Sequence, residues 1–179
     1  MPAIEIRPAI ESDIPHLVRL EHSYSSDYVW QMDLEAGETQ IEVHFREVRL
    51  PRSVRVDYPR SERALLQDWK QRSGVLVALL EKAPVGYASL VQNHAPKTTW
   101  VTDLVVGERL RRQGIGSALL LASQEWALGA GDVRLVMEVQ PRNYPAISLA
   151  QKLGLDFCGY DDHYYLNRDA AIFFAKWLR

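Results

Sequence analysis

The chain has 179 residues, 47% of them hydrophobic and 25% charged, and a formal net charge of −2. This length suits one domain with a single core, and the near-neutral charge excludes general nucleic-acid binding. The single cysteine, Cys158, permits no internal disulfide, and no apolar run is long enough to span a bilayer, so we expect a cytoplasmic protein without a membrane segment.

The first part of the chain predicts short strands and helices. "AIEIRPA" alternates like a strand, and Ser12 or Asp13 then caps a helix that runs to about Glu21. Residues 24–38, "YSSDYVWQMDLEAGE", show no clean period and predict a short helix within a loop, or a mobile flap. "TQIEVHFREVRL" alternates strictly and predicts a strand that breaks at Pro51, before a second alternating stretch, "SVRVDYP".

The middle of the chain predicts a helix, a hairpin and a further strand. "SERALLQDWKQR" resembles a capped amphipathic helix with Leu65, Leu66 and Trp69 facing inward. "VLVALLE" and "PVGYASLVQNH" are two apolar runs split by "KAP", a pattern typical of a hairpin. "TTWVTDLVV" predicts the next strand.

The last part alternates strand and helix. A helix is expected from Gly114 to Leu128, then the buried strand "VRLVMEVQ", then a helix from Asn143 to Gly154. Two final strands joined by a polar turn follow. This order indicates a mixed α+β protein.

The stretch "RLRRQGIGSALL" lies at a predicted strand-to-helix junction. The first turn of a helix leaves backbone N–H groups unpaired, and an anion can bind there. Gly114 and Gly116 would let a phosphate approach the backbone, while Arg111 and Arg112 add positive charge. The stretch therefore predicts a phosphorylated cofactor, although glycines before a helix and arginines on a solvated face are also common in ordinary loops.

Other nucleotide and metal sites match less well. A Rossmann fingerprint needs a third glycine where Leu119 stands, and a loop from Gly107 to Gln113 intervenes, although Glu138 lies at a plausible distance for a ribose-binding acid. A P-loop is excluded because no Gly-Lys-Ser or Gly-Lys-Thr occurs. The five histidines are scattered, so we expect no metal site.

The segment "LVVGERLRRQGIGSALL" resembles the GNAT superfamily of N-acetyltransferases. It carries that family's R/Q-x-x-G-x-G/A signature at residues 111–116, between a strand and an apolar helix. "EIRPAIESDIPHLVRL", "LVMEVQPRNYPAISLAQKLGLDFCG" and "HYY" also resemble parts of the family. The resemblance covers residues 4–22 and 75–178, whereas residues 24–74 match poorly.

This resemblance implies one domain over residues 1–179, of the α+β class with an α/β/α sandwich arrangement. A mixed, mostly antiparallel central sheet of about seven strands would contain one splayed strand pair and carry flanking helices. Residues 24–74 would form the variable side that selects the acceptor.

The resemblance also implies acetyl-CoA as co-substrate. Backbone groups of Leu104 and Val106 would bond to the pantetheine arm, and Asn143 would touch it unless it is only a helix cap. A backbone N–H near Val105 or Val106 would stabilise the oxyanion. The groups expected to hold the pyrophosphate belong to Arg111, Arg112, Gln113, Gly114, Ile115, Gly116 and Ser117.

Acetyl transfer to an amine requires a base, because removing the proton of an alkylammonium at pH 7 costs about 4–5 kcal/mol. Glu138 occupies a strand position where many relatives place a catalytic glutamate, and Asp103 is the reserve candidate. The family's usual acid, a tyrosine, is replaced by Ala150. The candidate substitutes are Tyr144, Cys158, Tyr164 and Tyr165, and we expect Tyr164 or Tyr165 to reach the sulfur.

The acceptor is the least determined feature. Tyr28 and Trp30, among the acids of residues 24–38, would suit a cationic amine, yet their rings would pack equally well in the core. The arginines of "FREVRLPRSVRVDYPR" would suit an anion, or an edge strand. A small-molecule or peptide amine is the broad expectation. An acetyl-CoA sensor with little turnover is the alternative, and an exposed edge strand would allow a homodimer.

Overall fold

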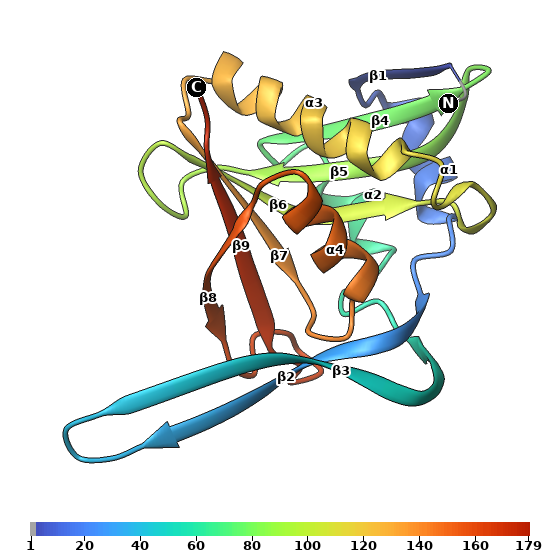
Figure 1. Cartoon of the computed structure of the whole chain (residues 1–179). Coiled ribbons are helices and arrows are strands. Elements are labelled where there is room, and N and C mark those ends of the chain that lie inside the picture. The colour runs from blue at the N-terminus through green and yellow to red at the C-terminus, as the bar shows by residue number, and fades with distance from the viewer. Residues whose placement is uncertain (1–2) are drawn as a thin grey trace.

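The computed structural model describes residues 3–179. Its body is a seven-stranded sheet with the strand order β1-β4-β5-β6-β7-β9-β8 (Figure 1). These strands are β1 Ile4–Pro8, β4 Gly74–Leu80, β5 Ala83–Val91, β6 Thr98–Val106, β7 Arg134–Val139, β8 Asp156–Asp161 and β9 Ala171–Trp177. All neighbours are antiparallel except β6 and β7, which confirms the mixed α+β sheet and excludes a doubly wound Rossmann sheet.

The helices lie on both faces of the sheet. They are α1 Ile14–Val18, α2 Ala64–Asp68, α3 Ile115–Gly129 and α4 Tyr144–Lys152, with single 3₁₀ turns at Glu11–Asp13 and Glu108–Leu110. One core lies under α3 and α4 and includes Leu119 and Ile147. A second core lies under α1 and α2 and includes Leu17, Leu65 and Tyr87. No helix within residues 3–179 is long and apolar enough to cross a membrane.

The parallel strands β6 and β7 separate part-way along their length. They pair only where Thr98–Val101 faces Arg134–Met137. Beyond that point β6 continues beside β5, and the end of β7 continues beside β9. The expected splayed pair is therefore present, and the second half of β6 has one edge without a strand partner.

A β-bulge at Thr102 changes which face of the sheet the following side chains meet. Ser89 opposes Asp103 and Leu90 opposes Val101, so Thr102 has no partner on β5. Val101 packs in the core under α3, whereas Val105 packs in the core under α1. Because side chains alternate along a strand, the extra residue moves Asp103 to the α1 and α2 face.

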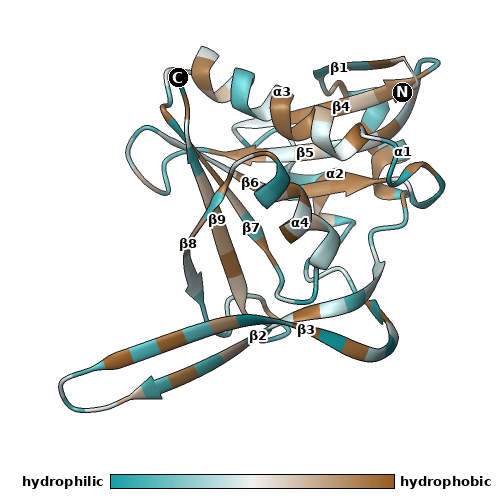
Figure 2. Ribbon diagram, in the orientation of Figure 1, coloured by the Kyte–Doolittle hydropathy of each residue, from teal (hydrophilic) through white to brown (hydrophobic). Residues whose placement is uncertain are grey.

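Strands β2 (Tyr24–Ala36) and β3 (Ile41–Val56) form a separate hairpin, which we call the arm. The arm crosses below the sheet and projects past β8, with alternating hydrophobic and hydrophilic bands (Figures 1 and 2). The prediction of a short helix within residues 24–38 is therefore wrong. Trp30, Met32 and Leu34 alternate with polar residues, and this period of two is that of a strand.

Pro51 does not end β3. Tyr28 opposes Arg49 and Ser26 opposes Val54, so residues 50–53 bulge out opposite Asp27. Proline is tolerated there because a bulged residue has no ladder hydrogen bond to lose.

The helix predictions are confirmed where the sequence pattern is long. Helices α3 and α4 lie where expected, and Gly154, at φ +75°, follows α4. The first helix is shorter than predicted because it ends at Val18. In α2, Leu65 is 1% exposed but Leu66 is 48% exposed, so the inward placement of Leu66 is wrong.

Candidate active site

The N-terminus of α3 presents unpaired backbone donors. Gly114 precedes the helix at φ +89°, a conformation that glycine adopts freely, and no side chain caps the helix. The first backbone bond of the helix runs from Ala118 N to Gly114 O at 3.0 Å. Within residues 3–179, the backbone N–H groups of residues 112–117 donate to no protein acceptor. This arrangement fits an anion.

The guanidinium of Arg111 is bonded to backbone carbonyls of the protein, which corrects the expectation that this side chain assists a phosphate. Its Nε donates to Val106 O at 2.9 Å and a terminal nitrogen donates to Ser23 O at 2.9 Å, with a third bond to Glu21 O. Its backbone N–H donates to Glu108 O at 3.3 Å. Burial also lowers the pKa of the Arg111 guanidinium. Arg112, which is exposed, is the remaining arginine of the pair.

The free edge of β6 offers backbone groups in alternation. Gly107 N donates to Val85 O at 2.8 Å. Since bonded pairs alternate in an antiparallel ladder, the backbone groups of Val105 face β5, and those of Leu104 and Val106 face the gap. Val105 is thereby disfavoured as the oxyanion donor, and the Val106 carbonyl is already bonded to Arg111.

Two buried carboxylates lie on the same face of the sheet beside this gap. Met137 and Val139 point into the core under α3, so Glu138 between them points to the opposite face, where Asp103 also lies. Their side chains are 0% and 1% exposed, respectively. Glu138 is therefore buried, and it pairs with an arginine.

Arg60 connects the two carboxylates. Its guanidinium pairs with Glu138 and lies 3.7 Å from Asp103 Oδ1. It also donates to Thr102 O at 2.9 Å and lies 5.0 Å from the centre of the Tyr165 ring. Two carboxylates, a carbonyl and an aromatic face are the groups that bind organic cations. Here a side chain of the same chain occupies that arrangement.

Asp103 is held by further donors. Arg72 donates to Asp103 Oδ2 at 2.9 Å, Thr102 Oγ1 donates to the same oxygen at 3.0 Å, and Tyr58 donates to Oδ1. Burial raises the pKa of the Asp103 carboxyl to about 7. The Arg72 charge and the Tyr58 hydroxyl act against that rise, because they stabilise the ionised form.

The analysis of the sequence did not identify Tyr58 or Arg72 as site residues, and it raised Arg60 only as one of several arginines that would suit an anion or an edge strand. They come from the segment between β3 and β4, within the residues 24–74 whose sequence matches the family poorly by motif. Arg60 reaches Glu138 across 78 positions and Arg72 reaches Asp103 across 31. No local pattern marks such pairs, so their only signal in the sequence was the presence of arginines in this segment.

The two tyrosines before β9 differ in placement. Tyr164 Oη donates to Glu138 Oε2 at 2.8 Å, and burial raises the pKa of its hydroxyl. Tyr165 is 6% exposed, and burial raises the pKa of its hydroxyl strongly. Of the two, only Tyr164 touches a candidate catalytic carboxylate.

The remaining predicted contact residues serve the packing of the arm and α4. Asn143 Oδ1 accepts from Ala146 N at 3.2 Å, so its helix-cap role is observed. The Tyr28 ring lies 4.7 Å from that of Tyr144, and the Trp30 ring lies 6.3 Å from that of Phe174. Trp30 therefore packs against the body, in line with the core alternative raised for it.

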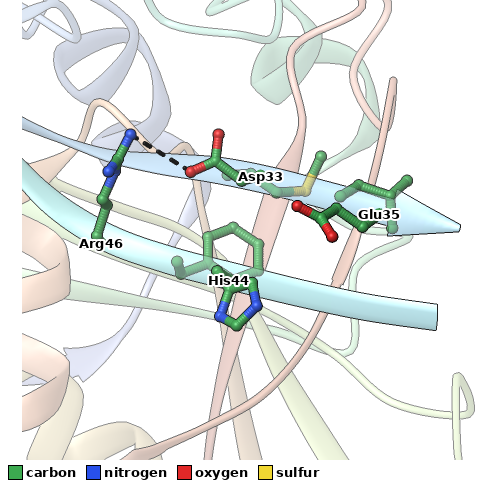
Figure 3. Close-up of a pocket in the computed structure, with 7 residues that line it drawn as sticks. Asp33, Glu35, His44 and Arg46 are labelled. Atoms are coloured by element: carbon green, nitrogen blue, oxygen red, sulfur yellow. Dashed lines mark ion pairs between the residues drawn. The ribbon is translucent and has the colours of Figure 1, made fainter. Parts of the chain in front are cut away.

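A hollow of about 680 Å³ lies on the arm, away from Asp103 and Glu138 (Figure 3). Its lining residues are Met32, Asp33, Leu34, Glu35, His44, Phe45 and Arg46. Asp33 and Arg46 form an ion pair across the two strands at 3.4 Å. None of the residues around Asp103 or Glu138 takes part in this hollow.

A model of the family described as "Acetyltransferase (GNAT) family" matches residues 41–155. The chain belongs to the GNAT acetyltransferase family. It is therefore an acyltransferase by family, as the signature at residues 111–116 predicted. No curated protein sequence matches the chain significantly.

Solved structures of acetyltransferases share the fold. Nourseothricin acetyltransferase superimposes with a TM-score of 0.81 at 22% identity, over 99% of both chains. A Bacillus anthracis str. Ames protein assigned as a streptothricin acetyltransferase, solved with acetyl coenzyme A, gives 0.75 at 19% identity, over 98% of this chain and 100% of that one. The ribosomal-protein-S18-alanine N-acetyltransferase of Escherichia coli gives 0.69 at 18% identity, over 98% and 94%.

In this GNAT acetyltransferase a buried alanine stands where the family resemblance places the tyrosine that acts as general acid. Ala150 is 0% exposed, packed in the core under α3 and α4. Cys158 lies on β8 with its residue surface exposed, and partial desolvation by its neighbours raises the pKa of the thiol. Within residues 3–179, no three metal-ligating side chains come together.

Proposed function

We propose that this protein transfers an acetyl group from acetyl-CoA to a primary amine of a small molecule or peptide by direct attack. The observation that carries the proposal is the pair of buried carboxylates, Asp103 and Glu138, beside the free edge of β6. The adjoining N-terminus of α3 supplies unpaired N–H groups. An anion site and a site for a cationic amine thus flank one strand edge.

In this proposal the pyrophosphate of acetyl-CoA binds at the N-terminus of α3. The N–H groups of Gln113, Gly114, Ile115, Gly116 and Ser117 hold it, and Arg112 adds charge. The Val106 N–H, at the end of β6 nearest α3, bonds to a pantetheine amide as an added strand would. The Leu104 N–H, further along the gap from the pyrophosphate, faces the thioester oxygen and stabilises the oxyanion.

Asp103 is the base in this scheme. A general base works best when its pKa lies near the operating pH, and burial raises the pKa of the Asp103 carboxyl to about 7. Glu138, held by Arg60 and Tyr164, attracts and orients the ammonium group. The amine then loses its proton to Asp103, directly or through water, and attacks the thioester carbon, and CoA leaves as the thiolate.

Tyr164 is the proposed acid that protonates the leaving thiolate. Its hydroxyl donates to Glu138, one of the two carboxylates of the proposed site. A thiolate with a pKa near 8.5 leaves readily, so this step needs less help than the removal of the proton from the amine. The replacement of the usual tyrosine by Ala150 is therefore compatible with turnover.

The acceptor proposed is a cationic amine. Arg60 lies where two carboxylates and the Tyr165 ring would receive an ammonium or a guanidinium. By their names, the structural neighbours described above act on nourseothricin or on an alanine of ribosomal protein S18, so both small-molecule and peptide amines belong in the test.

The experiment is release of free thiol from acetyl-CoA in the presence of a panel of amines. Release that depends on a cationic amine, with an acetylated product of the added mass, supports the proposal. The alternative, an acetyl-CoA sensor, is favoured by Ala150 and by the occupancy of the carboxylate site by Arg60. Saturable acetyl-CoA binding with no amine-dependent thiol release would establish the sensor instead.

A further inference from the structure

A buried histidine lies close to the site without touching either carboxylate. His22, on the segment between α1 and β2, is 4% exposed. Burial of an imidazole costs free energy unless both ring nitrogens are hydrogen-bonded. Nδ1 of His22 lies 2.7 Å from Leu20 O, and Nε2 lies 3.0 Å from Tyr87 Oη. Both ring nitrogens are therefore satisfied inside the protein.

These two hydrogen bonds fix the tautomer and the orientation of the ring. Because the Leu20 carbonyl can only accept, Nδ1 of His22 carries the proton and donates to it. Nε2 of the neutral ring then accepts from the Tyr87 hydroxyl. Burial lowers the pKa of the His22 imidazole, so the ring is neutral at pH 7. Rotation of the ring would break two buried hydrogen bonds.

The backbone on either side of His22 is tied to the loop that begins the glycine signature. Arg111 donates to Ser23 O at 2.9 Å and also to Glu21 O. Glu21 Oε1 accepts from the backbone N–H of Ser23 at 2.9 Å and from its hydroxyl at 2.7 Å. The backbone and the side chain of His22 are thus both held, although residues 21–23 belong to no helix or strand.

The His22 ring packs on Tyr58. The two ring centres lie 4.9 Å apart, with the planes inclined at 53°. Tyr58 follows the end of β3 in a stretch without helix or strand, and its hydroxyl donates to Asp103 Oδ1. A tyrosine on such a stretch needs a fixed neighbour if its hydroxyl is to stay on one oxygen, and His22 is a neighbour of that kind.

We propose that His22 is a positioning residue for Asp103. It holds the ring of Tyr58 so that the Tyr58 hydroxyl donates to the Asp103 carboxylate, and it touches neither reactant. Its catalytic meaning rests on the proposed function, in which Asp103 is the base, whereas the positioning is a property of the folded chain alone.

This arrangement has a consequence for the protonation of Asp103. The Tyr58 hydroxyl donates to the carboxylate and so favours its ionised form, against the burial that raises the pKa to about 7. Titratable groups face Asp103 from Tyr58, Arg60, Arg72 and Tyr165, and face His22 from Glu21, Tyr58, Glu62, Tyr87 and Arg111. Replacement of the neutral His22 ring removes no charge, so it should act on Asp103 through Tyr58.

The first test is the titration of the Asp103 carboxyl in the chain without cofactor. Carbon-13 NMR of chain labelled at aspartate measures it, and the signal is assigned by its loss in Asp103→Asn. In Tyr58→Phe the midpoint should move up by about one pH unit, the size expected for a hydrogen bond to a charged group. His22→Leu should move it in the same direction. His16→Leu, the same exchange at an exposed position of α1, is the matched control and should leave the midpoint unchanged.

A double-mutant cycle separates positioning from a direct effect on the carboxyl. In a chain that already carries Tyr58→Phe, His22→Leu should add no further shift. Tyr87→Phe removes only the hydroxyl on Nε2 and should give a smaller shift, which Tyr58→Phe also abolishes. Circular dichroism establishes which variants are folded, and Tyr87→Phe decides the matter if His22→Leu is not. For either variant, an unchanged midpoint in a folded chain, or a shift that adds to that of Tyr58→Phe, overturns the proposal.

The same variants in the acetyl-transfer assay distinguish this inference from the proposed function. If Asp103 is the base, the inflection of the pH–rate profile should move together with the NMR midpoint, and the KM for acetyl-CoA should not change. The expected NMR shifts in a chain that releases no thiol with any amine would refute the proposed acetyl transfer and support the positioning by His22. Amine-dependent thiol release with an NMR midpoint indifferent to His22 would do the reverse.

Discussion

Arg60 and Glu138 form an ion pair in which the carboxylate is 0% exposed and the guanidinium 29% exposed. Removing one partner of such a pair leaves a charge without compensation in the interior. Arg60→Ala should therefore lower the free energy of unfolding by about 2–3 kcal/mol, below the range for wholly buried pairs because Arg60 is partly exposed. Chemical denaturation measures this loss.

The same variant tests whether the carboxylate site accepts external cations. Methylguanidinium or a diamine should raise the melting temperature of Arg60→Ala more than that of the wild type, in which the side chain already fills the site. An equal shift in both proteins would contradict the assignment of this position as a cation site. Potassium chloride at the same ionic strength is the control for screening.

Asp103 should govern the pH dependence of acetyl transfer. A base with a pKa of about 7 must be deprotonated to act, so the rate should rise with pH through about 7 and then level off. Asp103→Asn should lower the rate roughly 10²–10⁴-fold and remove this inflection. Thiol release between pH 5.5 and 8.5 tests both, and an Asn variant that retains the inflection excludes Asp103 as the base.

The stability of the protein should depend on the same group with a defined sign. The folded state raises the pKa of Asp103 from its ordinary value of 3.8, so the folded chain binds the proton more tightly than the unfolded chain. The stabilisation that comes from this tighter proton binding is complete below the unfolded pKa of 3.8, and it is lost as the pH rises to about 7. Relative to Asp103→Asn, the wild type should lose stability over that window in urea titrations.

The glycines before and within α3 should matter more than the neighbouring charge for CoA binding. Gly114→Leu places a side chain at φ +89°, and Gly116→Leu adds one beside Leu149, 3.3 Å from its Cδ2. Calorimetry with CoA should show a larger loss for either than for Arg112→Ala. Gly129→Leu, at the far end of α3 with open space around it, is the matched control. The opposite ranking would assign the site to side-chain charge.

Tyr164 and Tyr165 provide a matched pair for the acid role. Tyr164→Phe removes the hydroxyl that donates to Glu138 and should lower the rate on the alkaline side of the profile. Tyr165→Phe removes a hydroxyl on a ring that is 6% exposed and should leave the shape of the profile unchanged. Identical profiles for Tyr164→Phe and the wild type would remove Tyr164 from the mechanism.

The sequence predicted the parts of the fold that local pattern controls. From Gly114 to Gly154 the helical period, the buried strand, the Asn143 cap and the glycine stop all agree with the structure. The arm was predicted wrongly although Trp30 and Met32 alternate with polar residues, because the acids and aromatics of that stretch obscured a period of two.

The active site was predictable only in part, for a physical reason. Glu138 and Asp103 lie on strands whose pattern is local, and the resemblance to the family then singled out Glu138, with Asp103 in reserve. Arg60 and Arg72 come to them from a segment that has little regular structure, and only the packed fold brings the charges together. Likewise, the use of Arg111 by three carbonyls depends on residues that precede it by about 90 positions or lie at the end of β6.

The bulge at Thr102, one extra residue in β6, decides where the carboxylate of Asp103 points. Without that one residue, Asp103 would turn away from Arg72 and toward the apolar core beneath α3, which includes Leu119 and Ile115. A carboxylate stranded there would oppose folding. We therefore expect insertion and acid to be inherited together: homologous sequences one residue shorter at this point should carry an uncharged residue in place of Asp103.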